Sequence, residues 1–241
     1  MRQKTRNIII AISLLLFPIT LNFFSPYVSI DGAMNGIISG SLIVFLFMFV
    51  TAIFFGRAWC GWICPMAGLS EICLKINNKN VNVKKLKIIR YSIFSLWAGF
   101  LVVCFILAGG VHDINPLHLT ENFISVDIPQ KYIIYYFVLA LFFGVTIIVG
   151  KRGACHSFCW MSPFLVGGFT LGTILKIPQL RIVSDKSNCV NCGLCNKKCP
   201  MSINVNSCVN NGCIKTSDCI LCGECVDTCK KKVLKFGIKN L

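Results

Sequence analysis

Two cysteine runs lie near the C-terminal end: Cys189-Val-Asn-Cys192-Gly-Leu-Cys195-Asn-Lys-Lys-Cys199 and Cys219-Ile-Leu-Cys222-Gly-Glu-Cys225-Val-Asp-Thr-Cys229. These runs decide how the rest of the chain is interpreted. Both have the spacing C-x2-C-x2-C-x3-C. A tight loop with three cysteines, followed by a fourth, is the ligand pattern of a [4Fe–4S] cluster. Two such runs in tandem predict two clusters in a small α+β domain.

In tandem runs of this kind, the fourth cysteine of each run ligates the other cluster. We therefore expect one cluster on Cys189, Cys192, Cys195 and Cys229, and a second on Cys219, Cys222, Cys225 and Cys199. A structural zinc site also uses four cysteines, but it does not explain the third cysteine of each loop or the doubling of the pattern. Cys208 and Cys213 lie between the runs. They could be extra ligands or a redox pair, but we favour the interpretation that they are small apolar residues.

The composition is that of a membrane protein with a small soluble part. The 241 residues are 55% hydrophobic and 14% charged, and the mean hydropathy is +0.72, whereas soluble proteins are about 45–50% apolar. Most of the sixteen cysteines have metal-ligand spacing, which requires reduced thiolates and a reducing compartment. The net charge of +15 would also suit a nucleic-acid partner, but the sequence contains no nucleic-acid motif.

Four apolar segments approach the ~20 residues needed to cross a bilayer: residues 8–24, 37–55, 91–108 and 132–149. A signal peptide is the alternative for the first, but no small-residue cleavage site follows it. A fifth apolar segment, residues 164–177, is too short to span, so we expect it to lie at the interface, re-enter or pack on the bundle. The segments 25–36 and 109–131 would then be external loops.

The basic residues indicate the orientation in the membrane. With four spans, all of the 24 lysines and arginines except Lys131 lie on the side of the two termini. The positive-inside rule identifies that side as the cytoplasm. We therefore expect a multi-pass protein of the cell membrane, in contact with lipid, with both termini and both cysteine runs in the cytoplasm.

An internal repeat divides the membrane part into two related halves. Arg57-Ala-Trp-Cys60-Gly-Trp-Ile-Cys64-Pro-Met66 matches Arg152-Gly-Ala-Cys155-His-Ser-Phe-Cys159-Trp-Met161 at an offset of 95 residues. Each copy follows a pair of predicted membrane helices. We therefore expect an all-α membrane domain at residues 1–178, with four transmembrane helices in two helical-hairpin halves, and a ferredoxin-like two-cluster domain at residues 179–241.

The paired cysteines of the repeat suggest chemistry in the membrane part. Cysteines four residues apart lie on one face of a helix, so Cys60 with Cys64 and Cys155 with Cys159 provide four thiolates for one further Fe–S cluster. A redox-active dithiol and ordinary buried cysteines are the alternatives. Arg57 and Arg152 would lower the thiol pKa and balance the charge of a cluster. Haem is not expected, since no predicted span contains histidine and C-x-x-C-H is absent.

The order of these features resembles the NapH-type membrane-bound 4Fe–4S ferredoxins, the quinol-dehydrogenase subunits of periplasmic nitrate reductase systems. The membrane parts of nitrous-oxide-reductase regulators and of cytochrome-oxidase accessory iron–sulfur proteins are similar. The resemblance implies electron transfer between the quinone pool and Fe–S partners, with C-x3-C-P motifs that face the cytoplasm. The second motif differs from the family pattern, because Trp160 stands where the first has Pro65.

The sequence as a whole predicts a membrane-bound electron-transfer protein that exchanges electrons between quinone or a redox partner and two [4Fe–4S] clusters. It would serve as the quinol-dehydrogenase or electron-transfer subunit of an oxidoreductase complex. The partner would be a ferredoxin, a flavoprotein or an Fe–S subunit, steered by the lysine-rich tail. The alternative is an accessory iron–sulfur protein for redox sensing or metalloenzyme maturation.

Overall fold

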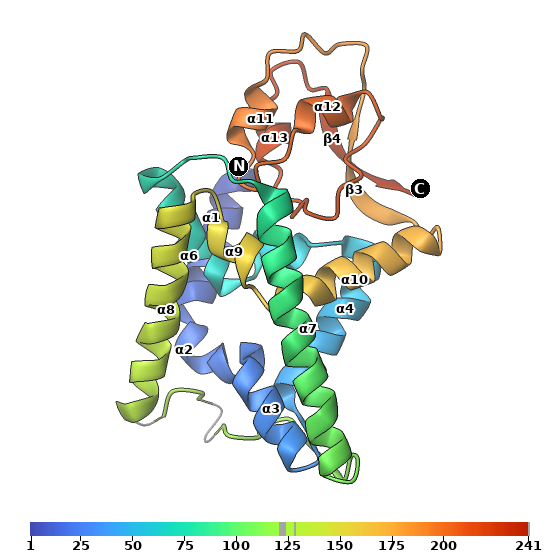
Figure 1. Ribbon diagram of the computed structural model, residues 1–241. Helices are drawn as coiled ribbons and strands as arrows, with labels where there is room; N and C mark the ends of the chain where they lie inside the picture. The colour runs from blue at the N-terminus through green and yellow to red at the C-terminus, as the bar shows by residue number, and fades with distance from the viewer. Residues whose placement is uncertain (121–123, 128, 241) are drawn as a thin grey trace.

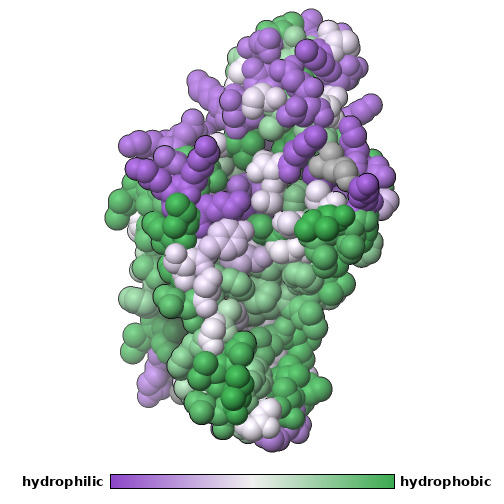
Figure 2. All heavy atoms as spheres, turned by 45° about the vertical axis from the view of Figure 1, so that its right-hand side comes forward, coloured by the Kyte–Doolittle hydropathy of each residue, from purple (hydrophilic) through white to green (hydrophobic). Residues whose placement is uncertain are grey.

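Two long apolar helices, α7 (Val83–Leu107) and α8 (Pro129–Val149), run along the body of the molecule (Figure 1). The computed structural model describes residues 1–120, 124–127 and 129–240. Both helices are long and apolar enough to cross a membrane. They cover the predicted spans 91–108, except for its last residue, and 132–149. Figure 2 shows hydrophobic side chains over this body and hydrophilic ones at the end that carries both termini, as expected for a protein with a lipid-facing belt.

The other two predicted spans are less regular. The first is α1 (Arg2–Leu15), α2 (Phe17–Thr20) and a 3₁₀ turn, η1 (Leu21–Phe24), with a 58° bend after α1. Pro18 explains the break, because proline cannot continue the hydrogen-bond ladder of a helix.

The second irregular segment, residues 37–55, is a short strand, β1 (Ile37–Ser39), followed by α4 (Gly40–Phe55). The 16 residues of α4 measure about 24 Å, less than the ~30 Å of a hydrocarbon core. The described residues thus contain two clear spans and a bent third, and the four-helix bundle stays a prediction.

The segments predicted as external loops contain regular structure. Residues 26–34 form a helix, α3 (Pro26–Met34), which the sequence analysis missed. Ser25 accepts a hydrogen bond from the Val28 amide and Pro26 occupies the first helical position, both standard helix-start signals. The strand β2 (Asp113–Asn115) pairs in parallel with β1, Ile37 opposite Asp113. Residues 121–123 and 128 of the second predicted loop lie outside the described residues.

The two repeat motifs form equivalent short helices, α5 (Ala58–Trp62) and α9 (Gly153–Ser157), which begin 95 residues apart. Each precedes a longer helix, α6 (Pro65–Ile76) or α10 (Met161–Ile174). The helix α10 packs along α4, and α6 packs on α8. Each helix after a motif therefore lies against the other half, which places both motifs at the junction of the halves. The fifth apolar segment, now α10, packs on the bundle.

One glycine permits the closest of these helix contacts. A Cβ on Gly168 of α10 would lie 2.1 Å from the carbonyl oxygen of Phe49 in α4. Small residues at helix crossings allow backbones in a membrane bundle to approach in this way.

The C-terminal unit (residues 179–240) sits at the end of the bundle where α1 begins (Figure 1). Its strands β3 (Gln179–Ser184) and β4 (Leu234–Lys239) pair antiparallel, Gln179 opposite Lys239. Three short helices complete it: α11 (Leu194–Lys198), α12 (Val205–Val209) and α13 (Glu224–Thr228). The unit is α+β, as expected, and the helices α11 and α13 pack together.

Candidate functional site

The two cysteine loops of the C-terminal unit share one backbone conformation. In the first loop Asn191 and Gly193 have φ of 53° and 70°, and in the second Leu221 and Gly223 have φ of 52° and 78°. Each loop leads directly into a five-residue helix. Left-handed residues interspersed in this way turn backbone amides toward a common point, which suits an anionic group.

The eight cysteines of these runs line two separate cavities. The distal cavity, of about 190 Å³, is lined by Cys189, Cys192, Cys195 and Cys229. The proximal cavity, of about 20 Å³, is lined by Cys199, Cys219, Cys222 and Cys225. The structure therefore brings together the two sets that the sequence predicted, each with its fourth cysteine from the other run. The packing of α11 on α13 produces this exchange.

The donor sets suit a cluster better than a single ion. Within the described ranges, no three His, Cys, Asp or Glu side chains approach closely enough to hold one metal ion. A four-iron cube takes one thiolate at each corner, so its ligands stand farther apart than those of one ion. The remaining walls of both cavities are mainly aliphatic, and all sixteen cysteines, each of them described, are free.

The thiols of the proximal cavity stay protonated until a cation binds. Burial raises the pKa of Cys219 to about 12 and that of Cys222 to about 11. The amides of Leu221 and Glu224 donate to these sulfurs and partly oppose the effect of burial. Assembly of a metal group here must therefore release protons.

The proximal loop rests directly on the bundle. The Trp62 Nε1 donates to the carbonyl oxygen of Leu221 at 3.0 Å, and the Gln3 Nε2 donates to that of Cys222 at 3.0 Å. A Cβ on Gly61 would lie 2.2 Å from the carbonyl oxygen of Ile220. The distal cavity lies away from these contacts, and its Cys192 is exposed to solvent.

Two carboxylates each lie between two buried arginines, and the first of them, Asp218, joins the proximal loop to the bundle. Asp218 Oδ1 lies 3.4 Å from Arg57 Nη1 and 3.5 Å from Arg90 Nη2. Burial alone would raise the pKa of Asp218, but these arginines outweigh it and hold the pKa below its ordinary value. Asp218 therefore stays charged at neutral pH.

Glu71 makes the second such bridge. It pairs with Arg6 and, at 2.7 Å, with Arg152 Nη2. The four guanidinium groups of the two bridges are at most 1% exposed.

The paired cysteines of the repeat do not lie on one helical face, and that prediction was wrong. Cys60 lies within α5, but Cys64 follows its end, with φ −59° and ψ 125°, and precedes Pro65 at the start of α6. Proline disfavours the helical conformation in the residue before it. The second motif breaks at the same place without a proline, since α9 ends at Ser157 and α10 begins at Met161. With Trp160 in place of proline, the second helix starts one residue later, at Met161, and Trp160 is its N-cap.

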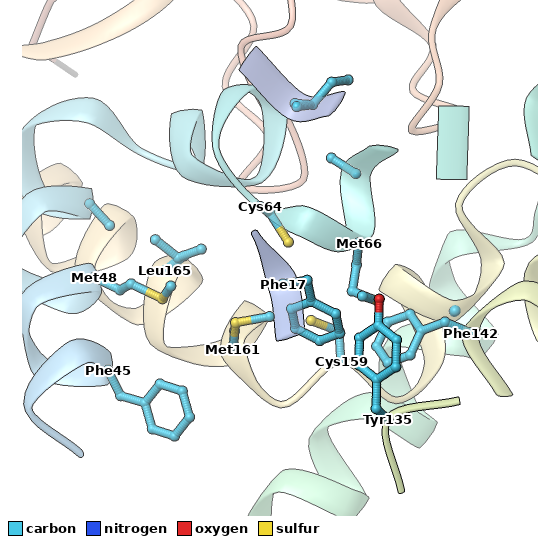
Figure 3. Packing of buried hydrophobic residues seen from close by; sticks show 14 of the residues in the cluster. Phe17, Phe45, Met48, Cys64, Met66, Tyr135, Phe142, Cys159, Met161 and Leu165 are labelled. Atoms are coloured by element: carbon cyan, nitrogen blue, oxygen red, sulfur yellow. The ribbon is translucent and has the colours of Figure 1, made fainter. Parts of the chain in front are cut away.

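The four cysteines of the repeat, the junction cysteines (Cys60, Cys64, Cys155 and Cys159), nevertheless meet. Arg152 Nη1, from the second half, donates to the Cys60 carbonyl oxygen at 3.2 Å. Ser70 Oγ, from the first half, lies 3.8 Å from Cys155 Sγ. Cys64 and Cys159 share one buried cluster, where Figure 3 shows both around Phe17.

Two of the junction sulfurs sit at helix N-termini. The amide of Met66, in the first turn of α6, donates to the sulfur of Cys64. The amide of Ser162, in the first turn of α10, donates to that of Cys159. Helix N-termini favour negative charge, so both positions suit thiolates.

An apolar pocket of about 520 Å³ opens beside the junction cysteines. Its walls come from the bent first segment, the start of α3 and one face of α8, and the equivalent residues Met66 and Met161 also line it. Figure 3 shows these two methionines with Phe17 and Phe142, which also line the pocket. The sequence analysis did not anticipate this pocket, because its walls come from segments distant in sequence.

The sequence analysis also missed the two carboxylates. Glu71 carried a signal, because it is the lone acidic residue between Gly56 and Arg90, a segment with seven basic ones. Asp218 directly precedes the second cysteine run, a place that carried no such signal. Of the cysteines between the runs, Cys213 is fully buried and bridges to Val183 of β3, whereas Cys208 is half-buried.

Comparison with known proteins indicates an iron–sulfur protein. The sequence model of a family described as "4Fe-4S binding domain" matches residues 39–84. An uncharacterized protein of Methanocaldococcus jannaschii is 27% identical over 208 residues, 82% of this chain and 79% of the relative. The ferredoxin-type protein NapH of Haemophilus influenzae is 26% identical over 211 residues, 83% of this chain and 68% of the relative.

A third relative is the putative electron transport protein YccM of Escherichia coli, which is 21% identical over 226 residues, 89% of this chain and 60% of the relative. No solved structure matches the chain. The cysteine-lined cavities, the apolar spans and these relatives define a ferredoxin-type 4Fe–4S protein of the membrane. These similarities confirm the resemblance to the NapH-type membrane-bound 4Fe–4S ferredoxins noted in the sequence.

The contact of Asp218 with Arg57 and Arg90 predicts how a variant changes hydrogen–deuterium exchange in the proximal loop. The variant Asp218→Asn leaves Arg57 and Arg90 buried without a carboxylate, which typically costs about 3–5 kcal/mol. We expect faster hydrogen–deuterium exchange in residues 219–222, because the proximal loop loses its attachment to the bundle. Asp185→Asn is the control, since Asp185 is exposed and its carboxylate accepts hydrogen bonds from Ser187 in its own turn. Equal exchange in the two variants would show that the bridge does not secure the interface.

Proposed function

We propose that the protein is a membrane-bound electron carrier that passes electrons between quinone in the bilayer and a protein partner in the cytoplasm, through two [4Fe–4S] clusters in the C-terminal unit. The observation that carries the proposal is the pair of cavities, each lined by four cysteines. A [4Fe–4S] cluster supplies a site that gains or loses an electron at a potential set by its surroundings. The printed names of NapH and YccM, ferredoxin-type and electron transport, point the same way.

The two cavities have different places in the proposed path. The proximal set (Cys199, Cys219, Cys222 and Cys225) rests on α5 and the buried arginines, so it would exchange electrons with the membrane part. The distal set (Cys189, Cys192, Cys195 and Cys229) reaches the solvent at Cys192, so it would exchange electrons with a partner. The burial of a metal site controls how far solvent and partner proteins can reach it.

The proposed membrane topology has four crossings, with the bent first segment and β1–α4 as the irregular ones. Both termini lie at the end that carries the C-terminal unit (Figure 1). The excess of lysine and arginine at that end supports a cytoplasmic location. Short or broken helices cross membranes where neighbouring protein satisfies their backbone groups, and the packing of α10 along α4 provides such a neighbour.

The apolar pocket is the proposed quinone site. Its volume of about 520 Å³ lies within the usual range of ligand pockets, about 300–1,000 Å³. The walls are almost entirely apolar, with Asn22, Ser125 and Lys131 among the few polar groups. Oxidation of a quinol there would release two electrons and two protons, and reduction of a quinone would take up both. Met66 and Met161 line this pocket, and each lies two residues after a junction cysteine, Cys64 or Cys159.

Filling the pocket tests the quinone proposal. Val138→Trp places an indole in the pocket, because Val138 is one of its lining residues on α8. The matched control is Ile133→Trp on the same helix, where the native side chain is 72% exposed and does not line the pocket. We expect reduction of the clusters by a soluble menaquinol analogue to slow at least roughly tenfold in V138W, the equivalent of ~1.4 kcal/mol. I133W should match the wild type.

Reduction by dithionite separates pocket effects from damage to the clusters. It should give the same cluster signal in the wild type and in both tryptophan variants, since the substitutions lie away from the cysteine cavities. Unchanged menaquinol kinetics in V138W would remove the pocket from the proposal and leave the two-cluster carrier in place.

The charge distribution of the C-terminal unit points to an acidic partner. Three of its four acidic residues pair with arginines of the bundle: Asp218 with Arg57 and Arg90, Glu224 with Arg6, and Asp227 with Arg2. The distal cavity instead has Lys230 and Lys231 in its wall, both exposed. A protein with an acidic surface, such as a ferredoxin or flavodoxin, would be steered to this rim.

Charge reversal at the rim tests the partner proposal. Lys230→Glu/Lys231→Glu should lower the rate of electron transfer to an acidic ferredoxin at low ionic strength by about an order of magnitude. The difference from the wild type should vanish at high salt, because salt screens exposed charges. Lys84→Glu/Lys85→Glu, an exposed pair at the start of α7, controls for net charge. If both double variants slow transfer equally, the lysines act only through the overall charge.

A further inference from the structure

We propose that the junction cysteines, Cys60, Cys64, Cys155 and Cys159, hold a third Fe–S cluster that is shared between the two halves of the bundle and enclosed by buried arginines. The proposal deepens the proposed function and rests on it, because the third cluster would connect the apolar pocket to the proximal cavity. It goes beyond the family match, which ends at residue 84 and contains only the first cysteine pair.

Contacts between the halves argue for a single shared site. Arg152, which begins the second motif, donates to the Cys60 carbonyl oxygen at 3.2 Å. Ser70, which follows the first motif, lies 3.8 Å from the sulfur of Cys155. Cys64 and Cys159 belong to one buried cluster. Each motif therefore contributes to the surroundings of the other motif's cysteines, and two independent sites would not need these contacts.

The backbone around the second cysteine of each pair is arranged for a thiolate. In each motif the second cysteine lies between two helices, Cys64 directly before α6 and Cys159 two residues before α10. The sulfurs of Cys64 and Cys159 receive amides from the first turns of these helices. Amide donors directed at cysteine sulfurs tune the potential of Fe–S clusters. A buried, neutral cysteine would gain little from two helix N-termini.

Unpartnered guanidinium atoms give independent evidence for an anionic occupant. Within the described part of the chain, Nε of Arg57, Nε of Arg152, and Nε and Nη1 of Arg90 are buried and have no hydrogen-bond partner. The charges that act on Arg57 come from Cys60, Asp218, Cys159 and Cys155. Arg57 thus lies near three of the junction cysteines, and it also acts on Cys219 of the proximal cavity.

The charge balance at the junction requires more negative charge than the carboxylates provide. Four buried arginines share Glu71 and Asp218, and an uncompensated buried charge costs several kcal/mol. Glu224, which lies 3.6 Å from Arg6, is partly exposed and belongs to the edge of the interface. Thiols or disulfides at the junction are neutral and would leave the imbalance. A cluster with four thiolate ligands is anionic, because the thiolates outweigh the positive iron–sulfide core.

The position of the site gives the third cluster a role. On one side, Met66 and Met161 follow the second cysteines of the two pairs and line the apolar pocket. On the other side, Gly61 lies next to Cys60 in α5 and contacts the proximal loop at Ile220. The junction cysteines thus stand between the proposed quinone site and the proximal cavity.

Iron quantitation on the full-length protein, purified without oxygen in lipid nanodiscs, tests the proposal. Three four-iron clusters give about 12 Fe per chain, and two give about 8. We expect about 12 Fe, with equal acid-labile sulfide, in the wild type and about 8 in the quadruple serine variant of the junction cysteines. The control is Cys73→Ser/Cys104→Ser, two buried cysteines of the bundle outside the motifs, which should keep about 12.

The two pair variants decide whether the cluster is shared. Cys60→Ser/Cys64→Ser and Cys155→Ser/Cys159→Ser should each lose as much iron as the quadruple variant. Losses of half that amount would mean two independent sites and would overturn the shared cluster. The EPR signals of the two clusters in the C-terminal unit should persist in every variant, which shows that the chain is folded.

Other results of the iron measurement would overturn either the third cluster or the proposed function. About 8 Fe in the wild type, unchanged in the quadruple variant, would overturn the third cluster and leave the two-cluster carrier standing. Zinc in place of the additional iron and sulfide would overturn it as well. We expect serine variants of the C-terminal cysteines to lose iron from the C-terminal unit and to keep the iron at the junction. A wild type whose C-terminal unit holds no iron would instead contradict the proposed function.

Discussion

The structure depends on two carboxylates that are each shared by two buried arginines. Asp218 belongs to the C-terminal unit and its arginines, Arg57 and Arg90, belong to the bundle. Glu71 belongs to the first half of the bundle and pairs with Arg6 and with Arg152 of the second half. One bridge therefore fixes the cysteine unit to the bundle, and the other fixes the two halves to each other. Buried pairs of this kind are costly to break, since the remaining partner is left charged in a low-dielectric environment.

These bridges place the redox-active side chains in one continuous region. The proximal cavity lies against α5, the junction cysteines lie where the halves meet, and the apolar pocket lies beyond them. The arginines that hold the interface also act as positive charges on cysteines of the junction and the proximal cavity, so one set of residues provides attachment and charge compensation. This double use explains why so many arginines are buried in a small bundle.

The features that the sequence predicted well are those encoded locally. The eight cysteines have spacing that defines both loops and their exchange of the fourth cysteine, and α7 and α8 are long apolar runs. The bend after α1 follows from Pro18, which lies within the first predicted span. The helix α3 follows from Ser25 and Pro26, a cap signal in a segment interpreted as loop.

Other features depend on contacts that no local pattern shows. The one-face arrangement of Cys60 and Cys64 was wrong because α5 ends at Trp62, and a new helix starts after Cys64. The arginines Arg6, Arg57, Arg90 and Arg152 entered the sequence analysis mainly as charges on the cytoplasmic side, yet they are buried. Their carboxylate partners come from other elements, and composition gives no indication of such pairing. The walls of the apolar pocket likewise converge only in the folded chain.

The central claim is that iron sites form a line from the bundle to the outer surface of the C-terminal unit. The most direct measurement is an anomalous difference map at the iron absorption edge, from crystals of the full-length protein grown without oxygen. We expect three separate peaks, at the junction cysteines, in the proximal cavity and in the distal cavity, in that order from the membrane. Peaks confined to the C-terminal unit, or an iron peak at the distal cysteines that lies nearer to Arg57 than the proximal peak, would contradict it.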